Sequence, residues 1–320
     1  MEYQNQAREN SEMKKQAWIG LFISIGLILS GCGAGEETAS TKKEEKSTVY
    51  SVKDDRGEEV TFKKVPETVV SLQPSNTEIL YAVGAGDKVV GVTEFDHYPK
   101  EVEDLEVISD SMTVNTEKVI SLDPDVVIAY TTGDEAGVKQ LEDAGIPVFV
   151  IQSAQTFDDV YGDIEQVAKV MGAQKKGNEV IEGMKKQISD VGEKVKSLGA
   201  KEKVYFEISP APEIYTAGSA TFQQEILQAA GVDNVFADQE GWPKLGEEEI
   251  IKRNPATILT TVNYVENPVD EIKSRTGWDT IDAVKDDRVI YLDSDVMSRP
   301  GPRIGEAVEI TAKAVYPDLF

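Results

Sequence analysis

Few side chains in this sequence could carry out covalent chemistry. His97 is the single histidine and Cys32 the single cysteine, so hydrolysis at a histidine-bound metal and Cys–His catalysis are both excluded. The patterns HExxH, CxxC, GxSxG and GxxxxGK(S/T) are absent. Acidic pairs such as Asp54-Asp55 are typical of caps and solvated turns. The residue types therefore indicate binding without catalysis, with no cofactor and no metal ligands of the protein's own.

Aromatic and cationic side chains are the remaining candidates for a site. Five aromatic residues lie in turns or just beyond predicted strands, where side chains face a cleft more often than a core. They are Tyr98, Tyr130, Tyr215, Trp242 and Tyr264. Arg299 and Arg303 stand in one rigid turn, Ser-Arg-Pro-Gly-Pro-Arg, and Asp295 follows a predicted strand. Aromatic walls with a few guanidinium groups suit a large, ring-rich ligand that carries carboxylates or amides.

The structural alternative for each of these tyrosines is ordinary partial burial. Trp278 differs from them, because it lies near Ile281 and Val284 on a predicted helix. We expect it in the core.

Alternating strand and helix patterns would position these side chains. Residues 49–172 and residues 200–320 each consist of short apolar strands separated by capped helices. This alternation predicts an α/β fold of two Rossmann-like lobes with mostly parallel sheets. In open αβ sheets ligands sit beyond the carboxyl ends of the strands. Two lobes that face each other therefore predict a cleft between them.

Residues 173–199 are predicted to join the lobes. Their apolar residues recur at steps that alternate between three and four, which places one narrow stripe along a helix. The stripe consists of Ile181, Met184, Ile188, Val191, Val195 and Leu198. A helix of roughly 35 Å would bridge the two lobes as a rigid strut. A short coiled-coil dimer is the alternative.

Two sequence repeats flank this helix in the same order. The segment EILYAVG at 78–84 recurs as EILQAAG at 225–231. A second segment, at 115–128, is echoed at 248–259, each time as a short helix, a proline and a strand. Two matches in one order indicate two related lobes on either side of a connector.

The N-terminal residues indicate export. Met13-Lys14-Lys15 precedes an apolar run from Trp18 to Leu29 that is too short to span a bilayer comfortably. The run ends in Leu-Ser-Gly-Cys32, which resembles the bacterial lipobox; a short membrane anchor with an incidental cysteine is the alternative. Residues 1–31 are predicted as the signal peptide, and residues 32–48, which lack large apolar side chains, as a lipidated flexible tether.

The charge of the chain limits its partners. A formal net charge of −25 excludes nucleic acid and an anionic membrane surface, because both need clustered Lys and Arg. Contact with the membrane is therefore expected through the lipid anchor only.

Several ordered blocks resemble the helical-backbone substrate-binding proteins of ABC importers for metal chelates, and among them the vitamin B12 binders. The blocks are VVSLQPSNTEILYAVGAGDKVVGVT, YPKEVEDLEVIS, NTEKVISLDPDVVIA, NVFADQEGWPKLGEEEIIKRNPATIL and SRPGPRIGEA. The resemblance spans residues 49–320 and implies two rigidly bridged lobes with little hinge closure. It also implies a monomeric, lipid-anchored protein on the extracytoplasmic face that captures a chelate and delivers it to a permease and its ATPase.

The resemblance also implies which residues contact the cargo. The pocket positions of the family map onto Tyr98, Tyr215, Trp242, Asp295 and Arg299. The B12 binders carry tryptophans where this chain has Ser111 and Tyr130, so two large ring contacts are missing. A corrinoid such as cobalamin is the first expectation, and a ferric siderophore or haem is the alternative.

Proteins of this family dock onto the permease through one surface glutamate of each lobe, which pairs with arginines. By motif these are Glu117 in NTEKV and Glu248 in GEEEII, and the internal repeat places both at equivalent sites. Glu78 and Glu225 are the second choice. A glutamate at a helix start also favours the helix dipole, so its presence alone decides nothing.

Two rival functions remain from other classes. A hydrolase acting in the cleft is one, although the missing nucleophile–base pair counts against it. A ligand-free adhesion or assembly protein that uses the acidic surface is the other.

The lipobox generates a direct prediction. Cys32→Ser removes the thiol that would receive the lipid, so the protein should appear in the medium, or in the periplasm of a cell with two membranes. Immunoblots of membrane and soluble fractions check this. A variant that stays in the membrane fraction would contradict the lipid anchor.

Overall fold

The computed structural model describes residues 49–110, 113–130 and 135–320. Ser47–Phe320 form one compact unit. The predicted signal peptide and tether, with Cys32, lie outside the described residues, as does Ser111. None of the helices in the described ranges combines the length and apolar character needed to cross a lipid bilayer.

The first lobe is built around a parallel sheet. Within the described residues its strand order is β5-β4-β3-β6-β7, and each neighbouring pair is parallel. An antiparallel hairpin of β1 and β2 precedes it. The elements are β1 (Tyr50–Lys53), β2 (Glu59–Phe62), β3 (Val69–Ser71), α1 (Pro74–Ala82), η1 (Gly86–Lys88), β4 (Val89–Thr93), η2 (Lys100–Asp104), β5 (Glu106–Ser109), α2 (Thr116–Leu122), β6 (Val126–Tyr130), α3 (Glu135–Asp143), β7 (Val148–Ile151) and α4 (Phe157–Val170).

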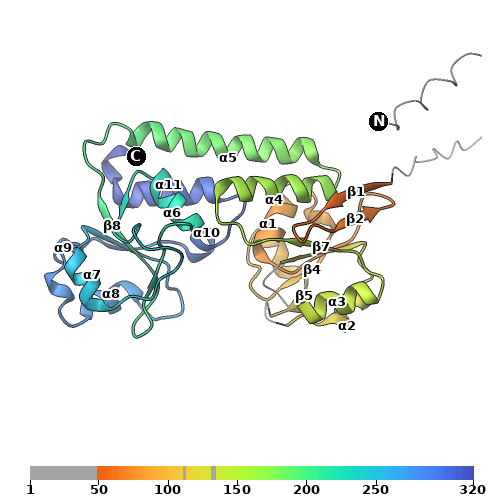
Figure 1. The fold of residues 1–320 in the computed structure, drawn as a ribbon, viewed down its shortest axis with the longest axis horizontal. Helices are drawn as coiled ribbons and strands as arrows, with labels where there is room; N and C mark the ends of the chain where they lie inside the picture. Colours follow the sequence, from red (N-terminus) through yellow and green to blue (C-terminus); the bar gives the residue numbers. More distant parts are fainter. Residues whose placement is uncertain (1–48, 111–112, 131–134) are drawn as a thin grey trace, which may run out of the picture. The chain divides into compact units, whose positions relative to one another are not determined.

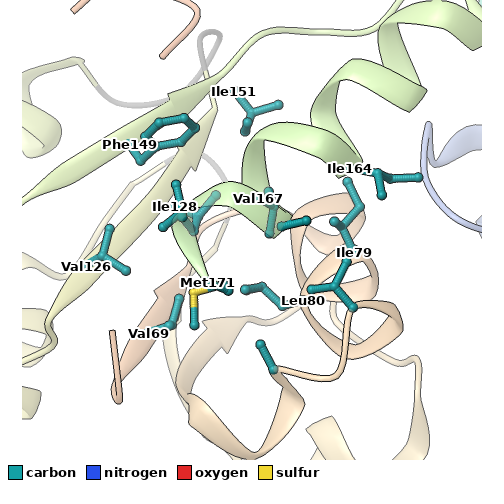
Figure 2. Packing of buried hydrophobic residues seen from close by; sticks show 14 of the residues in the cluster. Val69, Ile79, Leu80, Val126, Ile128, Phe149, Ile151, Ile164, Val167 and Met171 are labelled. Carbon is teal, nitrogen blue, oxygen red and sulfur yellow. The ribbon is translucent and has the colours of Figure 1, made fainter. Parts of the chain in front are cut away.

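Helices cover both faces of this sheet. Successive strand residues point to opposite faces, so Val69 and Ile128 pack against α1 and α4, whereas Val70 and Val127 pack against α2 and α3. Figure 2 shows the first of these two cores, in which strand side chains meet those of α1 and α4. The predicted Rossmann-like lobe with a parallel sheet is therefore present, and helices cover both faces of that sheet.

The second lobe repeats the plan. Its described strands are ordered β10-β8-β11-β12, all parallel, and β9 pairs with β8 in the antiparallel direction. Trp278 is fully buried in its core, as predicted. The elements are β8 (Lys203–Ser209), β9 (Tyr215–Thr216), α6 (Phe222–Ala229), β10 (Asp233–Asn234), α7 (Glu247–Arg253), β11 (Thr257–Thr260), α8 (Pro268–Ser274), η3 (Trp278–Thr280), α9 (Asp282–Lys285), β12 (Val289–Tyr291), α10 (Ser294–Ser298), α11 (Ile304–Val315) and η4 (Pro317–Leu319).

The sequence repeat corresponds to a repeated structural unit. Helices α2 and α7 both have seven residues. Each ends at a residue in the left-handed conformation, Asp123 with φ 47° and Asn254 with φ 44°. A proline follows each of these residues, and the chain then enters β6 or β11, the strands that pair with β3 and β8. The two lobes thus share one local design.

Helix α5 (Gln174–Val195) bridges the lobes. Its apolar stripe packs on both of them: Ile181 and Met184 belong to the core of the first lobe and Val191 to that of the second, while Ile188 contacts both. Helix α11 runs beside it (Figure 1). The stripe is buried within the chain, which confirms the strut. Leu198 lies beyond the end of the helix.

Two glycines of α5 test how closely it packs. A Cβ on Gly177 would lie 2.7 Å from the Cβ of Ala168 on α4, whereas a Cβ on Gly183 meets nothing within 4 Å. Gly183→Ala should stabilise the protein by up to about 1 kcal/mol through helix propensity. Gly177→Ala should be less stable than Gly183→Ala by about 2 kcal/mol, because the overpacked interface must shift. Denaturant unfolding of both variants measures the difference; equal stabilities would contradict the close α4–α5 contact.

Candidate ligand-binding cleft

Loops at the carboxyl ends of parallel strands from both lobes line a pocket of about 460 Å³. The first lobe contributes residues that follow β3 and β4, and the second lobe contributes the end of β12 and residues that follow β11 and β12. From the first lobe these are Gln73, Pro74, Phe95 and His97. From the second they are Asn263, Tyr291, Asp293, Ser294, Asp295 and Arg299. The pocket thus lies where open αβ sheets bind their ligands.

Two of the predicted cargo contacts, Asp295 and Arg299, lie in this pocket. Phe95 and Tyr291 also line the pocket, and each side chain is about half exposed. Neither is among the site residues predicted from the sequence. Both could have been found from the rule that predicted Asp295, because each stands at or just after the end of a parallel strand. His97, the single histidine, lines the same pocket.

Three other predicted aromatic residues make contacts outside the described lining of this pocket. Tyr264 is exposed, with its hydroxyl 3.5 Å from Ser209 Oγ. Trp242 donates from Nε1 to Gln223 Oε1 at 3.3 Å, and Tyr215 pairs through its backbone with Lys244. These side chains are placed on the second lobe, but they are not among the described lining residues of the pocket.

Tyr130 ends β6 and is partly buried. Burial raises the pKa of its hydroxyl. A hydrogen bond with Ser153 partly opposes this rise, and the nearby Asp163 adds to it. Burial also raises the pKa of Asp163 to about 8, assisted by the charges of Asp55 and Asp159. Asp163 is nevertheless absent from the described lining of the cleft, and no group of three His, Cys, Asp or Glu residues in the described ranges could hold a metal ion.

A buried ion cluster joins the lobes behind the pocket. Glu78 of α1 is 3% exposed and accepts three hydrogen bonds from the second lobe. Arg303 donates from Nε at 2.8 Å and from Nη2 at 2.6 Å, and Arg299 donates from Nη1 at 3.1 Å. A glutamate held in this way cannot reach another protein, so the second-choice assignment of Glu78 to docking is wrong. Its repeat partner Glu225 is also turned inward, and accepts a hydrogen bond from Phe157 N at 2.6 Å.

The same arginines hold the loop that carries Phe95 and Tyr98. Arg299 Nη2 donates to the carbonyl of Phe95 at 2.7 Å and pairs with Asp295 Oδ2 at 2.8 Å. The guanidinium of Arg303 lies 4.3 Å from the centre of the Tyr98 ring. Burial alone would lower the pKa of Arg303, but the hydrogen bonds to Glu78 and the negative charges of Glu78 and Glu306 together raise it. The cluster therefore links both walls of the cleft through charge-assisted hydrogen bonds.

A short helix carries Asp295 into the pocket. As the sequence predicts, Asp293-Ser294-Asp295 comes just after a strand, β12, and the chain then enters α10 at Ser294. Asp293 caps this helix by accepting a hydrogen bond from Val296 N at 2.9 Å. Asp295 then lies in the first turn, where a carboxylate is favoured by the helix dipole.

The glutamates predicted to dock occupy matching surface positions. Glu117 and Glu248 are each the second residue of their helix, α2 and α7, and both are exposed. Asn115 caps α2 by accepting from Lys118 N at 3.0 Å, and Gly246 precedes α7. The repeated helix–strand unit therefore presents one carboxylate from each lobe.

Comparison with known proteins defines the family. A sequence model of the periplasmic binding protein family matches residues 69–296. The chain belongs to this family. Over 317 residues, this periplasmic binding protein is 44% identical to the uncharacterized ABC transporter substrate-binding lipoprotein YvrC of Bacillus subtilis, covering 96% of this chain and 99% of the relative. It is 30% identical to the vitamin B12-binding protein of Vibrio parahaemolyticus, covering 76% and 86%.

Solved structures of periplasmic binding proteins share its fold. A possible iron-binding protein from Staphylococcus epidermidis has a TM-score of 0.72 at 34% identity, covering 79% of this chain and all of that one. The periplasmic haem-binding protein RhuT from Roseiflexus, without ligand, has a TM-score of 0.73 at 26% identity, covering 79% and 99%. These relatives are named as solute-binding proteins, which points to a binding role for this periplasmic binding protein.

The buried cluster predicts a large effect on stability. Glu78→Gln preserves shape but removes the charge that faces two guanidinium groups, so the free energy of unfolding should fall by about 3–5 kcal/mol. Glu117→Gln, an exposed change of the same kind, should shift it by less than about 0.5 kcal/mol. Urea unfolding of the two variants beside the unaltered protein measures both. Equal stabilities would show that the lobes do not depend on Glu78.

Proposed function

We propose that this protein captures a bulky metal chelate in the cleft between its lobes and delivers it to an ABC permease. A corrinoid such as cobalamin is the first candidate cargo. The observation that carries the proposal is the pocket at the strand ends, which is shaped by both lobes and lined by exposed aromatic rings. Its volume of about 460 Å³ falls within the range of small-molecule sites, about 300–1,000 Å³.

The relatives support this choice and one alternative. The B12-binding relative from Vibrio matches three quarters of the chain, which favours a corrinoid. The solved iron-binding and haem-binding structures support the same transport role with a ferric siderophore or haem as cargo. Tyr98, Tyr130, Tyr215, Trp242 and Tyr264 are proposed as further cargo contacts around the pocket, together with Ser111.

The proposed cell biology follows from the N-terminal sequence and the relatives. Residues 1–31 would be removed as a signal peptide, and Cys32 would carry the lipid that holds the protein on the extracytoplasmic face of the membrane. Residues 32–48 would act as the tether, followed by the lobe at 49–172, the connecting helix at 173–199 and the lobe at 200–320. The lipoprotein relative from Bacillus supports this arrangement.

Thermal unfolding with candidate cargoes tests the capture role. A ligand at 100 times its dissociation constant adds about 2.7 kcal/mol to the free energy of unfolding, so the midpoint should rise by several degrees with cobalamin or cobinamide. Haem and several ferric siderophores serve as competing ligands. A rise with one of these alone would keep the transport role and reassign the cargo. No rise with any chelate would contradict the proposal.

Docking predicts a separate phenotype. Replacing Glu117 and Glu248 together by Ala should leave the affinity for the chelate unchanged and abolish its uptake, because the carboxylates give register with permease arginines. The matched control replaces two other exposed glutamates, Glu165 of α4 and Glu182 of α5, by Ala. Uptake of labelled chelate by cells measures both. Normal uptake by cells that carry the Glu117→Ala, Glu248→Ala variant would show that these glutamates do not contribute to docking.

A further inference from the structure

The cleft is acidic. Among the described residues that line the pocket, the side chains with a fixed charge are Asp293, Asp295 and Arg299. Glu78 lies directly behind Arg299, and Arg303 behind Glu78. Three carboxylates thus face two guanidinium groups, which leaves a net negative charge at the site.

Both guanidinium groups are already engaged. The side chain of Arg299 is 10% exposed, and its donors reach Glu78, Asp295 and the Phe95 carbonyl at 2.7–3.1 Å. The side chain of Arg303 is 14% exposed and makes two hydrogen bonds to Glu78. A carboxylate on a ligand would have to displace one of these contacts. Doing so would leave Glu78 buried with less counter-charge, which is costly.

The carboxylates have acceptor positions left for a ligand. Asp293 uses one oxygen to accept from Val296 N, and Asp295 uses one to pair with Arg299. An ionised carboxylate has about four acceptor positions, so each group can accept an N–H from a bound molecule. Asn263 adds an amide to the same lining.

We infer that the cleft selects chelates whose periphery is uncharged or cationic, with amide or ammonium donors, over chelates that carry carboxylates. The inference rests on the proposed function and specifies its cargo class. Amide N–H groups match Asp293 and Asp295, whereas a carboxylate on the ligand would be repelled by them. Corrinoids, with their peripheral carboxamides, and cationic ferric hydroxamates belong to the favoured class. Haem, with two propionates, belongs to the other.

Matched ligand pairs isolate charge from shape. Cyanocobalamin is compared with its monocarboxylic acids, in which one peripheral amide is hydrolysed. Ferrioxamine B, with a pendant ammonium, is compared with its succinylated form, which ends in a carboxylate. Equilibrium dialysis with the full-length protein gives the dissociation constants. Like charges held close together at a partly solvated surface repel each other, so the carboxylate form of the bound chelate should bind about fivefold or more weakly.

A charge-matched pair of variants assigns the effect to the cleft. With Asp293→Asn and Asp295→Asn together, the dissociation constants of the amide and carboxylate forms should differ by no more than about twofold. Asparagine still caps α10. Asp190→Asn with Asp286→Asn makes the same change in net charge on exposed residues outside the pocket, and should leave the difference unchanged.

The outcomes separate two failures. Equal or tighter binding of the carboxylate form would overturn the charge selection while leaving the transport role intact. The charge selection would also be overturned if the control variant reduced the difference in dissociation constant as much as the cleft variant does. Binding of haem alone would keep the transport role and overturn the charge selection. If no chelate binds, haem and other ferric siderophores included, the proposed function itself fails and the inference falls with it.

Discussion

The interaction on which the rest of the structure depends is the buried carboxylate of Glu78 between two guanidinium groups. An isolated buried charge is costly, and pairing offsets that cost only with close geometry. Here all three hydrogen bonds are 3.1 Å or shorter. Because Glu78 lies on α1 while Arg299 and Arg303 stand just before α11, this cluster fixes one lobe against the other at the back of the cleft.

The connecting helix makes that arrangement stiff. One apolar stripe of α5 enters the cores of both lobes, so the lobes cannot separate without exposing Ile181, Ile188 or Val191 to water. A hinge closing around cargo would need the same packing to slide. A site held in this way is largely formed before the ligand arrives, and a preformed site loses less free energy to ordering on binding. Selection must then come from the lining itself, from its rings and its charge.

Local signals could be predicted from the sequence, and distant pairings could not. Thr156 and Asp159 form a capping box, and their spacing in the sequence indicates it because both partners lie within one turn. The stripe of α5 and the paired repeats also follow from spacing along the chain. The contacts of Glu78 join residues 221 and 225 positions apart, and no periodicity encodes them. From the sequence alone Glu78 is therefore predicted as a surface residue. Its contact with Arg303 becomes visible only in the folded structure.

The repeat gives the two lobes a similar helix–strand unit, but each lobe contributes different residues to the cleft. A helix that leads into a parallel strand runs antiparallel to it, so the N-termini of α2 and α7 lie toward the carboxyl edges of their sheets. Glu117 and Glu248 are therefore displayed toward the edge from which the cargo loops project. The loops themselves have diverged: Phe95 and His97 come from the first lobe, and Asp293 and Asp295 from the second. The shared helix–strand unit thus displays a matching pair of carboxylates, whereas the two lobes line the pocket with different residues.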